Sequence, residues 1–496
     1  MKELSLLIIG LALWVSLLGG EKNNASLKFD SSAGEKQTLT MPDGTVIGYT
    51  AYTHLYYVTN VEDSVYQFLN VFVPDGATQS TPIFLRTYVG GYMASAAGMP
   101  QADDASGRAL KEGYVLVIPG TRGRNSTVRK NGKTIYTGRA PKAIVDLKAA
   151  IRYLRHFDKE MLGDAEIIIT DGTSAGGAMS ALMGATGNNP AYEKYLKEAG
   201  AAQERDDVFA SVCYCPITDL THADMAYEWL YGGTAGRQAE DEAHKRVSAE
   251  LAAMFPAYVN GLGLKKADGM MLTSDNYLDF IKSELIRSAQ IAKNAGADIP
   301  DSIGFKFSAQ ASFGAPPING GKTAETNGMP LVRQGGMRKM AGEYITDLDM
   351  PTYLDYVSTK TRLKTAPAFD SKGVAGNGAS GENDEFGDEN GSSVNFTEYS
   401  ASQNGTAISE SVKEYAYLLN PMEQIGQDDV TVAQHWYIRH GAIDRDTAFP
   451  VPLNLALKLQ NTGKDVNYLL AWNRPHSGDY ALDEMFAWIA SIVKKP

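Results

Sequence analysis

The sequence predicts an α/β fold, with a mostly parallel sheet of eight strands, helices on both faces and a large insertion. Short apolar runs rich in β-branched residues recur along the chain, and helical patterns separate them. Residues 216–433 then separate the sixth run from the seventh. Because a single core rarely grows beyond about 250–300 residues, a chain of this length is expected to hold two units.

The expected strands follow from the apolar runs and the turn-rich sequence between them. The first two read as an antiparallel opening pair, and the others as strands of a parallel sheet. The eight runs cover residues 46–52, 68–73, 83–88, 115–119, 167–170, 208–215, 434–439 and 466–472.

Two helices and the division of the chain follow from the remaining patterns. Apolar residues at helical spacing over residues 143–154, after Pro141, predict a crossover helix. Within the insertion, Ser274 or Asp275 caps a helix that stops near Gly296. Residues 313–317 are rich in glycine and proline, and the acidic run 377–393 reads as a solvated loop. We therefore expect a core of residues 26–221 and 426–496, with residues 222–425 inserted as a lid or substrate-binding unit.

Composition and the N-terminus limit the partners and the location. A net charge of −12 disfavours nucleic acid as a partner, so a small neutral or weakly acidic ligand is expected. Residues 1–20 combine Lys2 with the apolar run 6–18, which is typical of a signal peptide or an uncleaved anchor. We expect a secreted, periplasmic or cell-surface protein of bacterial type, in which only this segment contacts a membrane. Cys213 and Cys215 lie too close along one strand to form a disulfide with each other.

The motif Gly-Thr-Ser-Ala-Gly at residues 172–176 directly follows an expected strand and precedes a run of small residues. A G-x-S-x-G sequence between a strand and a helix is the nucleophile elbow of the α/β-hydrolase fold, and it predicts Ser174 as the nucleophile. One oxyanion-hole donor is expected to be the N–H group of Ala175. The second is Gly90 or Gly91, in the glycine-containing loop after the third strand.

A serine nucleophile needs an imidazole base and a carboxylate that orients it. In this fold the base follows the last strand, and among the seven histidines only His476 does so. The acid follows the preceding strand, where Asp444 is nearest to the strand end. Asp446, and Asp219 after the sixth strand, are alternative acids. This chemistry requires no metal and no organic cofactor.

The elbow motif, the sequence Arg-His-Gly-Ala-Ile-Asp-Arg-Asp-Thr at 439–447 and His-Ser-Gly-Asp-Tyr at 476–480 together resemble the bacterial tannases. The likeness extends to Leu-Lys-Thr-Ala-Pro-Ala-Phe-Asp at 363–370 and so covers most of the chain. Fungal tannases carry cysteines where this chain has Thr173 and Pro475, so the resemblance is to the bacterial group.

The resemblance implies an esterase that releases gallic acid from galloyl esters, with a small phenolic ester as its substrate. It implies a triad of Ser174, Asp444 and His476. It also implies that Lys364, Glu382 and Asp446 bind the three ring hydroxyls, with Glu385 as the alternative to Glu382.

Other readings remain open at the level of the sequence. A feruloyl esterase or another carboxylic-ester hydrolase shares the triad and differs in the insertion. An inactive hydrolase-like binding protein is disfavoured by the intact Ser, Asp and His residues. A dipeptidyl-peptidase-like enzyme would carry N-terminal propeller repeats, which the sequence lacks.

Overall fold

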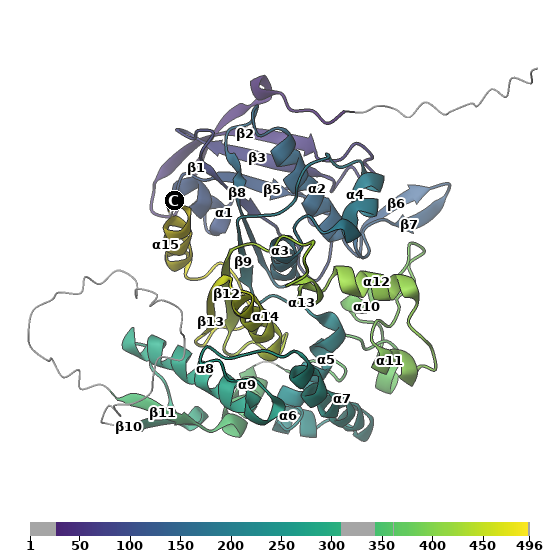
Figure 1. The fold of residues 1–496 in the computed structure, drawn as a ribbon, viewed down its shortest axis with the longest axis vertical. Coiled ribbons are helices and arrows are strands. Elements are labelled where there is room, and N and C mark those ends of the chain that lie inside the picture. Colours follow the sequence, from purple (N-terminus) through teal and green to yellow (C-terminus); the bar gives the residue numbers. More distant parts are fainter. Residues whose placement is uncertain (1–25, 309–342, 361, 495–496) are drawn as a thin grey trace, which may run out of the picture.

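In the computed structural model, which describes residues 26–308, 343–360 and 362–494, a nine-stranded sheet runs through the centre (Figure 1). The eight expected strands are all present, and the additional strand β1 pairs with β2 at one edge. β1 is mostly polar and has no buried residue, so it lacks the apolar run by which the others were recognised. In spatial order the strands are β1 (Glu35–Thr40), β2 (Val46–Tyr56), β3 (Phe68–Pro74), β5 (Val115–Pro119), β4 (Pro82–Arg86), β8 (Asp164–Thr173), β9 (Ala210–Tyr214), β12 (His435–Gly441) and β13 (Asp465–Ala471).

The strand directions decide where the functional residues emerge. The pairs β1–β2, β2–β3 and β3–β5 are antiparallel, and every later pair in the sheet is parallel. Parallel strands point their carboxyl ends toward the same edge. The segments that follow β4, β8, β9, β12 and β13 therefore all meet at one edge of the sheet.

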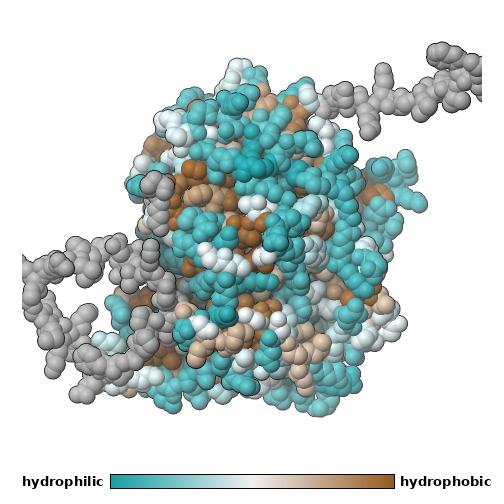
Figure 2. Space-filling model, in the orientation of Figure 1, coloured by the Kyte–Doolittle hydropathy of each residue, from teal (hydrophilic) through white to brown (hydrophobic). Residues whose placement is uncertain are grey.

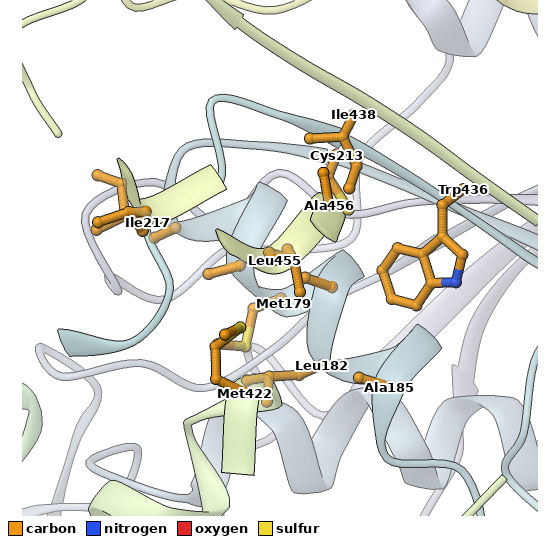
Figure 3. Packing of buried hydrophobic residues seen from close by; sticks show 14 of the residues in the cluster. Met179, Leu182, Ala185, Cys213, Ile217, Met422, Trp436, Ile438, Leu455 and Ala456 are labelled. Carbon is orange, nitrogen blue, oxygen red and sulfur yellow. The ribbon is translucent and has the colours of Figure 1, made fainter. Parts of the chain in front are cut away.

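Helices cover both faces of the sheet, as the alternation of side chains requires. In β5, Val115 and Val117 join one apolar cluster, whereas Leu116 and Ile118 join the other. The second cluster includes α1 (Ala105–Lys111) and α15 (Leu482–Val493). The first includes the expected crossover helix α2 (Lys142–His156), α3 (Ala175–Ala185) and α14 (Pro450–Asn461). Figure 3 shows α3 and α14 side chains packed beside Trp436 of β12.

The chain between β9 and β12 is largely helical; in Figure 1 residues 220–308 and 343–360 lie mostly below the sheet, and residues 374–424 lie beside it at the right. Its apolar residues, such as Tyr277 and Leu285, belong to the same cluster as Leu453 of α14. The helix expected near residue 274 is present, but Thr273 caps it, through a capping box with Asn276. The elements of this stretch are α5 (Leu220–Tyr231), α6 (Ala235–Gln238), α7 (Glu242–Gly261), α8 (Ser274–Asn294), η3 (Asp301–Ile303), β10 (Phe305–Ser308), β11 (Tyr344–Leu348), α9 (Met350–Lys360), η4 (Val374–Gly376), α10 (Gly381–Glu385), α11 (Glu398–Gln403), α12 (Glu410–Leu418) and α13 (Pro421–Gln424).

The acidic run 377–393 is not a plain solvated loop. It contains α10, and both Asn383 and Glu385 are fully buried. The side-chain amide of Asn383 donates to Asp370 at 2.6 Å, which ties the run to the preceding segment. Composition alone could not show this contact.

The remaining elements lie outside the central sheet, and they are η1 (Ser31–Ala33), the hairpin of β6 (Thr127–Lys130) and β7 (Lys133–Tyr136), η2 (Pro190–Tyr192) and α4 (Glu193–Ala199). On the face shown in Figure 2, hydrophilic residues predominate and apolar ones form small separate patches.

Cys213 and Cys215 are buried and not bridged. Among the described residues, no helix has the length and apolar character needed to span a membrane. The segments 1–20 and 313–317, singled out in the sequence, lie outside the described residues.

Candidate active site

Ser174 stands at a strained turn between β8 and α3. Its φ of 64° and ψ of −124° are unusual for a residue with a side chain. A Cβ atom on Gly172 would lie 2.3 Å from the carbonyl oxygen of Gly176, and one on Gly176 would lie 2.7 Å from that of Val89. The backbone N–H of Ser174 donates to the carbonyl of Tyr214 at 2.9 Å. The glycines therefore permit a tight turn that leaves the side chain of Ser174 partly exposed.

His476 and Asp444 form a close pair. The Nδ1 atom of His476 lies 2.7 Å from Oδ2 of Asp444, whose side chain is fully buried. The other oxygen of Asp444 accepts the backbone N–H of Asp446 at 2.8 Å. Of the three candidate acids, the structure therefore pairs Asp444 with His476. The carboxylate of Asp219 is instead bound by His222 and Asn420, each at 2.7 Å.

The electrostatics of the pair suit a neutral base held by an ionised acid. Burial would raise the pKa of Asp444, but His440 and the hydrogen bonds from His476 and from the N–H of Asp446 lower it to about 2. Burial would lower the pKa of His476, but the hydrogen bond to Asp444 and the charges of Asp444 and Asp446 raise it above the usual value of an imidazole. The ionised carboxylate thus favours the tautomer of His476 that leaves Nε2 free to accept a proton.

An ion-pair bridge holds the His476 loop against the nucleophile strand. Arg86, at the end of β4, pairs with Asp171 on β8 and with Asp479, 2.6 Å away in the His476 loop. A Cβ atom on Gly478 would lie 1.9 Å from Oγ1 of Thr173, so this loop packs directly against the residue before Ser174. The structure therefore brings the segments that carry Ser174, Asp444 and His476 together at one sheet edge.

The candidate oxyanion donors lie beside this turn. Ala175 is the first residue of α3, where a backbone N–H has no partner within the helix. In the described part of the chain, the N–H groups of Gly90 and Gly91 donate to no protein acceptor. The loop is fixed by Arg124, whose Nε donates to the carbonyl of Gly91 at 2.8 Å, and by Tyr92, whose hydroxyl donates to the carbonyl of Ile217 at 2.8 Å.

Lys364 and Asp446 both lie near His476. The negative charge of Asp446 raises the pKa of His476, and the positive charge of Lys364 lowers it. One oxygen of Asp446 lies within 4.8 Å of ligand atoms of both Asp444 and His476. The ammonium group of Lys364 sits 4.1 Å from the ring centre of Phe369. A cation and a carboxylate therefore lie near the base.

The two candidate glutamates of α10 occupy different environments. Glu382 is partly exposed. After burial, its negative charge is the largest cause of the raised pKa of Tyr92 in the oxyanion loop. Glu385 is fully buried, its two carboxyl oxygens have no hydrogen-bond partner among the described residues, and burial raises its pKa to about 8. Glu382 is therefore the carboxylate that a ligand beside Tyr92 could reach.

The sequence did not reveal several supporting residues. His440 is fully buried, and its Nδ1 atom lies 3.5 Å from Oδ2 of Asp444. The charged residue Arg86, at the end of an apolar strand, was the signal that could have pointed to the ion-pair bridge. Among the residues that the structure describes, two groups of side chains could geometrically hold a metal ion, Cys215 with His440 and Asp444, and Asp444 with Asp446 and His476. In both, the oxygens of Asp444 already accept the hydrogen bonds described above.

Comparisons with known proteins identify a family model and solved structures that this chain resembles. Residues 69–253 match the family model BD-FAE. The chain is 33% identical to a tannase from Fusobacterium nucleatum (TM-score 0.81; 95% of this chain and 100% of that one). It is 35% identical to a tannin acyl hydrolase from Lactobacillus plantarum (TM-score 0.79; 94% and 98%). A tannin acyl hydrolase in complex with ethyl gallate is 34% identical (TM-score 0.79; 94% and 98%).

Curated relatives match over shorter stretches. The chain is 33% identical over 90 residues to the esterase LipQ of Mycobacterium tuberculosis, and this alignment spans 18% of the chain and 20% of LipQ.

Proposed function

This chain belongs to the bacterial tannases, and we propose that it is a serine esterase that hydrolyses galloyl esters and releases gallic acid. The observation that carries the proposal is the 2.7 Å pair of His476 with Asp444, beside a strained serine turn at the same sheet edge. A serine esterase uses these three groups and requires no cofactor.

In the proposed reaction, Ser174 attacks the ester carbonyl while His476 accepts its proton. Asp444 stabilises the resulting imidazolium. The N–H of Ala175, together with that of Gly90 or Gly91, binds the oxyanion, and each such donor is worth about 100- to 1,000-fold in rate. His476 then protonates the leaving alcohol, and water releases gallate from the acyl-enzyme.

Recognition of the galloyl ring falls to Lys364, Glu382 and Asp446. Three phenolic hydroxyls buried without partners would be costly, and a cation with two carboxylates satisfies them. The family member with bound ethyl gallate supports this substrate class. Lys364 and Glu382 both come from the insertion 222–425, which we therefore regard as the substrate-binding part of the chain.

The test compares hydrolysis of methyl gallate, methyl ferulate and methyl benzoate by the wild type and by Ser174→Ala. We expect methyl gallate to be strongly preferred and the variant to lose essentially all activity. A preference for ferulate would instead assign the chain to the feruloyl esterases in activity.

We also propose that residues 1–20 direct export. A mature N-terminus found beyond residue 20 in the extracellular or periplasmic fraction would support export, and an intact N-terminus in the cytoplasm would contradict it.

A further inference from the structure

Three buried tyrosines of the insertion hold the loop that carries Asp444 and Asp446. The hydroxyl of Tyr353 on α9 donates to the carbonyl of Ala442 at 2.7 Å. On α5, Tyr231 donates to the carbonyl of Asp444 at 3.0 Å and Tyr227 to that of Arg445 at 2.8 Å. All three side chains are completely buried. The insertion therefore fixes the backbone on which the acid and the ring-binding carboxylate stand.

Tyr227 differs from the other two because its hydroxyl makes a second bond. Its oxygen accepts the backbone N–H of Lys364 at 3.0 Å. One hydroxyl group thus joins the main chain of Lys364 to the carbonyl of Arg445, the residue between Asp444 and Asp446.

The ring of Tyr227 supports the side chain of Lys364 as well. It meets the ring of Phe369 edge-on, with the centroids 6.3 Å apart, and the ammonium group of Lys364 lies over that same Phe369 ring. The carbonyl of Lys364 is held independently by buried Arg237, at 2.9 Å. The main chain of Lys364 is therefore held by Tyr227 on α5 and by Arg237 on α6. Its ammonium group lies over Phe369, which itself packs against Tyr227.

We propose that Tyr227 is a positioning residue for ring recognition, whose hydroxyl sets the placement of Lys364 relative to Asp446. This inference rests on the proposed function. A cation and a carboxylate that bind adjacent hydroxyls of one ring need a fixed separation, and small misplacements of such groups are costly. Tyr227 acts on the selectivity for hydroxylated rings, whereas Tyr231 and Tyr353 support the acid loop for any ester.

The experiment compares Tyr227→Phe with the matched control Tyr231→Phe. Each removes one buried hydroxyl that donates to a carbonyl of the same loop, but only the first also releases Lys364. The readout is the ratio of kcat/KM for methyl gallate to that for methyl benzoate. We expect Tyr227→Phe to lower this ratio about 10-fold, chiefly through KM for methyl gallate. Tyr231→Phe is expected to change both substrates alike. Equal ratios in the two variants would overturn the inference.

A double-mutant cycle with Lys364→Met tests whether Tyr227 acts through Lys364. In the Lys364→Met background, Tyr227→Phe should leave the ratio unchanged, and a further 10-fold fall would contradict the inference. Should Tyr227→Phe fail to fold, 3-fluorotyrosine at position 227 keeps the bond donated to Arg445 but weakens the oxygen as an acceptor for the N–H of Lys364, and it must also lower the ratio. A wild type that does not discriminate between the two esters would refute the proposed function, whereas discrimination that survives in Tyr227→Phe refutes only this inference.

Discussion

Replacing Asp444 with asparagine hardly changes the shape of the side chain, but it reverses the direction of the hydrogen bond between this residue and His476. The oxygen of the new amide can still accept the N–H of Asp446, at the 2.8 Å seen for Oδ1. Its NH₂ group then faces Nδ1 of His476, where Oδ2 now lies at 2.7 Å. To accept from that group, the imidazole must carry its proton on Nε2, and it can no longer take the proton of Ser174.

The expected loss is about 10,000-fold in kcat for methyl gallate, the cost of a wrong tautomer in such triads. The pH profile provides an independent check. Activity requires neutral His476, so the wild type loses activity as the pH falls through the raised pKa of His476. Asparagine removes the charge that raises this pKa while burial still lowers it, so the acid limb of the residual activity should move to lower pH.

The assay is steady-state hydrolysis of methyl gallate across pH, with thermal unfolding as a control for folding. A loss smaller than about 10-fold, or an acid limb that does not move in a folded variant, would refute the assignment of Asp444 as the acid.

Three further substitutions test ring binding by Lys364, the ion-pair bridge of Arg86 and the protonation of buried Glu385. Lys364→Met should lower kcat/KM for methyl gallate about 10- to 100-fold, the worth of one charged hydrogen bond, and should spare a butyrate ester; equal losses would remove Lys364 from ring binding. Arg86→Met leaves the fully buried Asp171 without its cation, so it should lower the free energy of unfolding by about 3–5 kcal/mol. Denaturant unfolding measures this loss, and an unchanged midpoint would contradict the ion-pair bridge. The pKa of Glu385 is about 8 in the folded chain, against about 4.5 for an ordinary glutamate. Its contribution to the free energy of unfolding therefore falls as the pH rises from about 4.5 to 8, by at most about 1.4 kcal/mol per pH unit. Glu385→Gln should flatten this dependence, and an unchanged slope of Tm against pH would show that Glu385 is ionised in the native state.

The local patterns in the sequence predicted the features that depend on neighbours along the chain. Apolar runs located the buried strands, and the order of strand ends selected Asp444 and His476 from many acids and seven histidines. The polar strand β1 escaped because an exposed edge strand needs no apolar run. Residues 377–393 were misjudged because burial of Glu385 depends on how the insertion folds back on the core.

Contacts between distant segments had no local signal. The hydroxyl of Tyr227 reaches Arg445 more than 200 positions along the chain, and nothing in the spacing of α5 distinguishes this tyrosine from an ordinary core residue. The same holds for Arg86 and Asp479, which meet only because β4 and β13 end at the same edge of the sheet. The sequence could therefore supply the reacting groups, but not the network that positions them.

Covalent labelling with a fluorophosphonate probe, followed by peptide mapping, tests the reactive serine most directly. The assignment of Ser174 as a nucleophile activated by His476 predicts a single adduct on Ser174, slowed by excess methyl gallate and nearly abolished by His476→Ala in a folded protein. An adduct on another residue, or labelling of Ser174 that is indifferent to the loss of the imidazole, would contradict it.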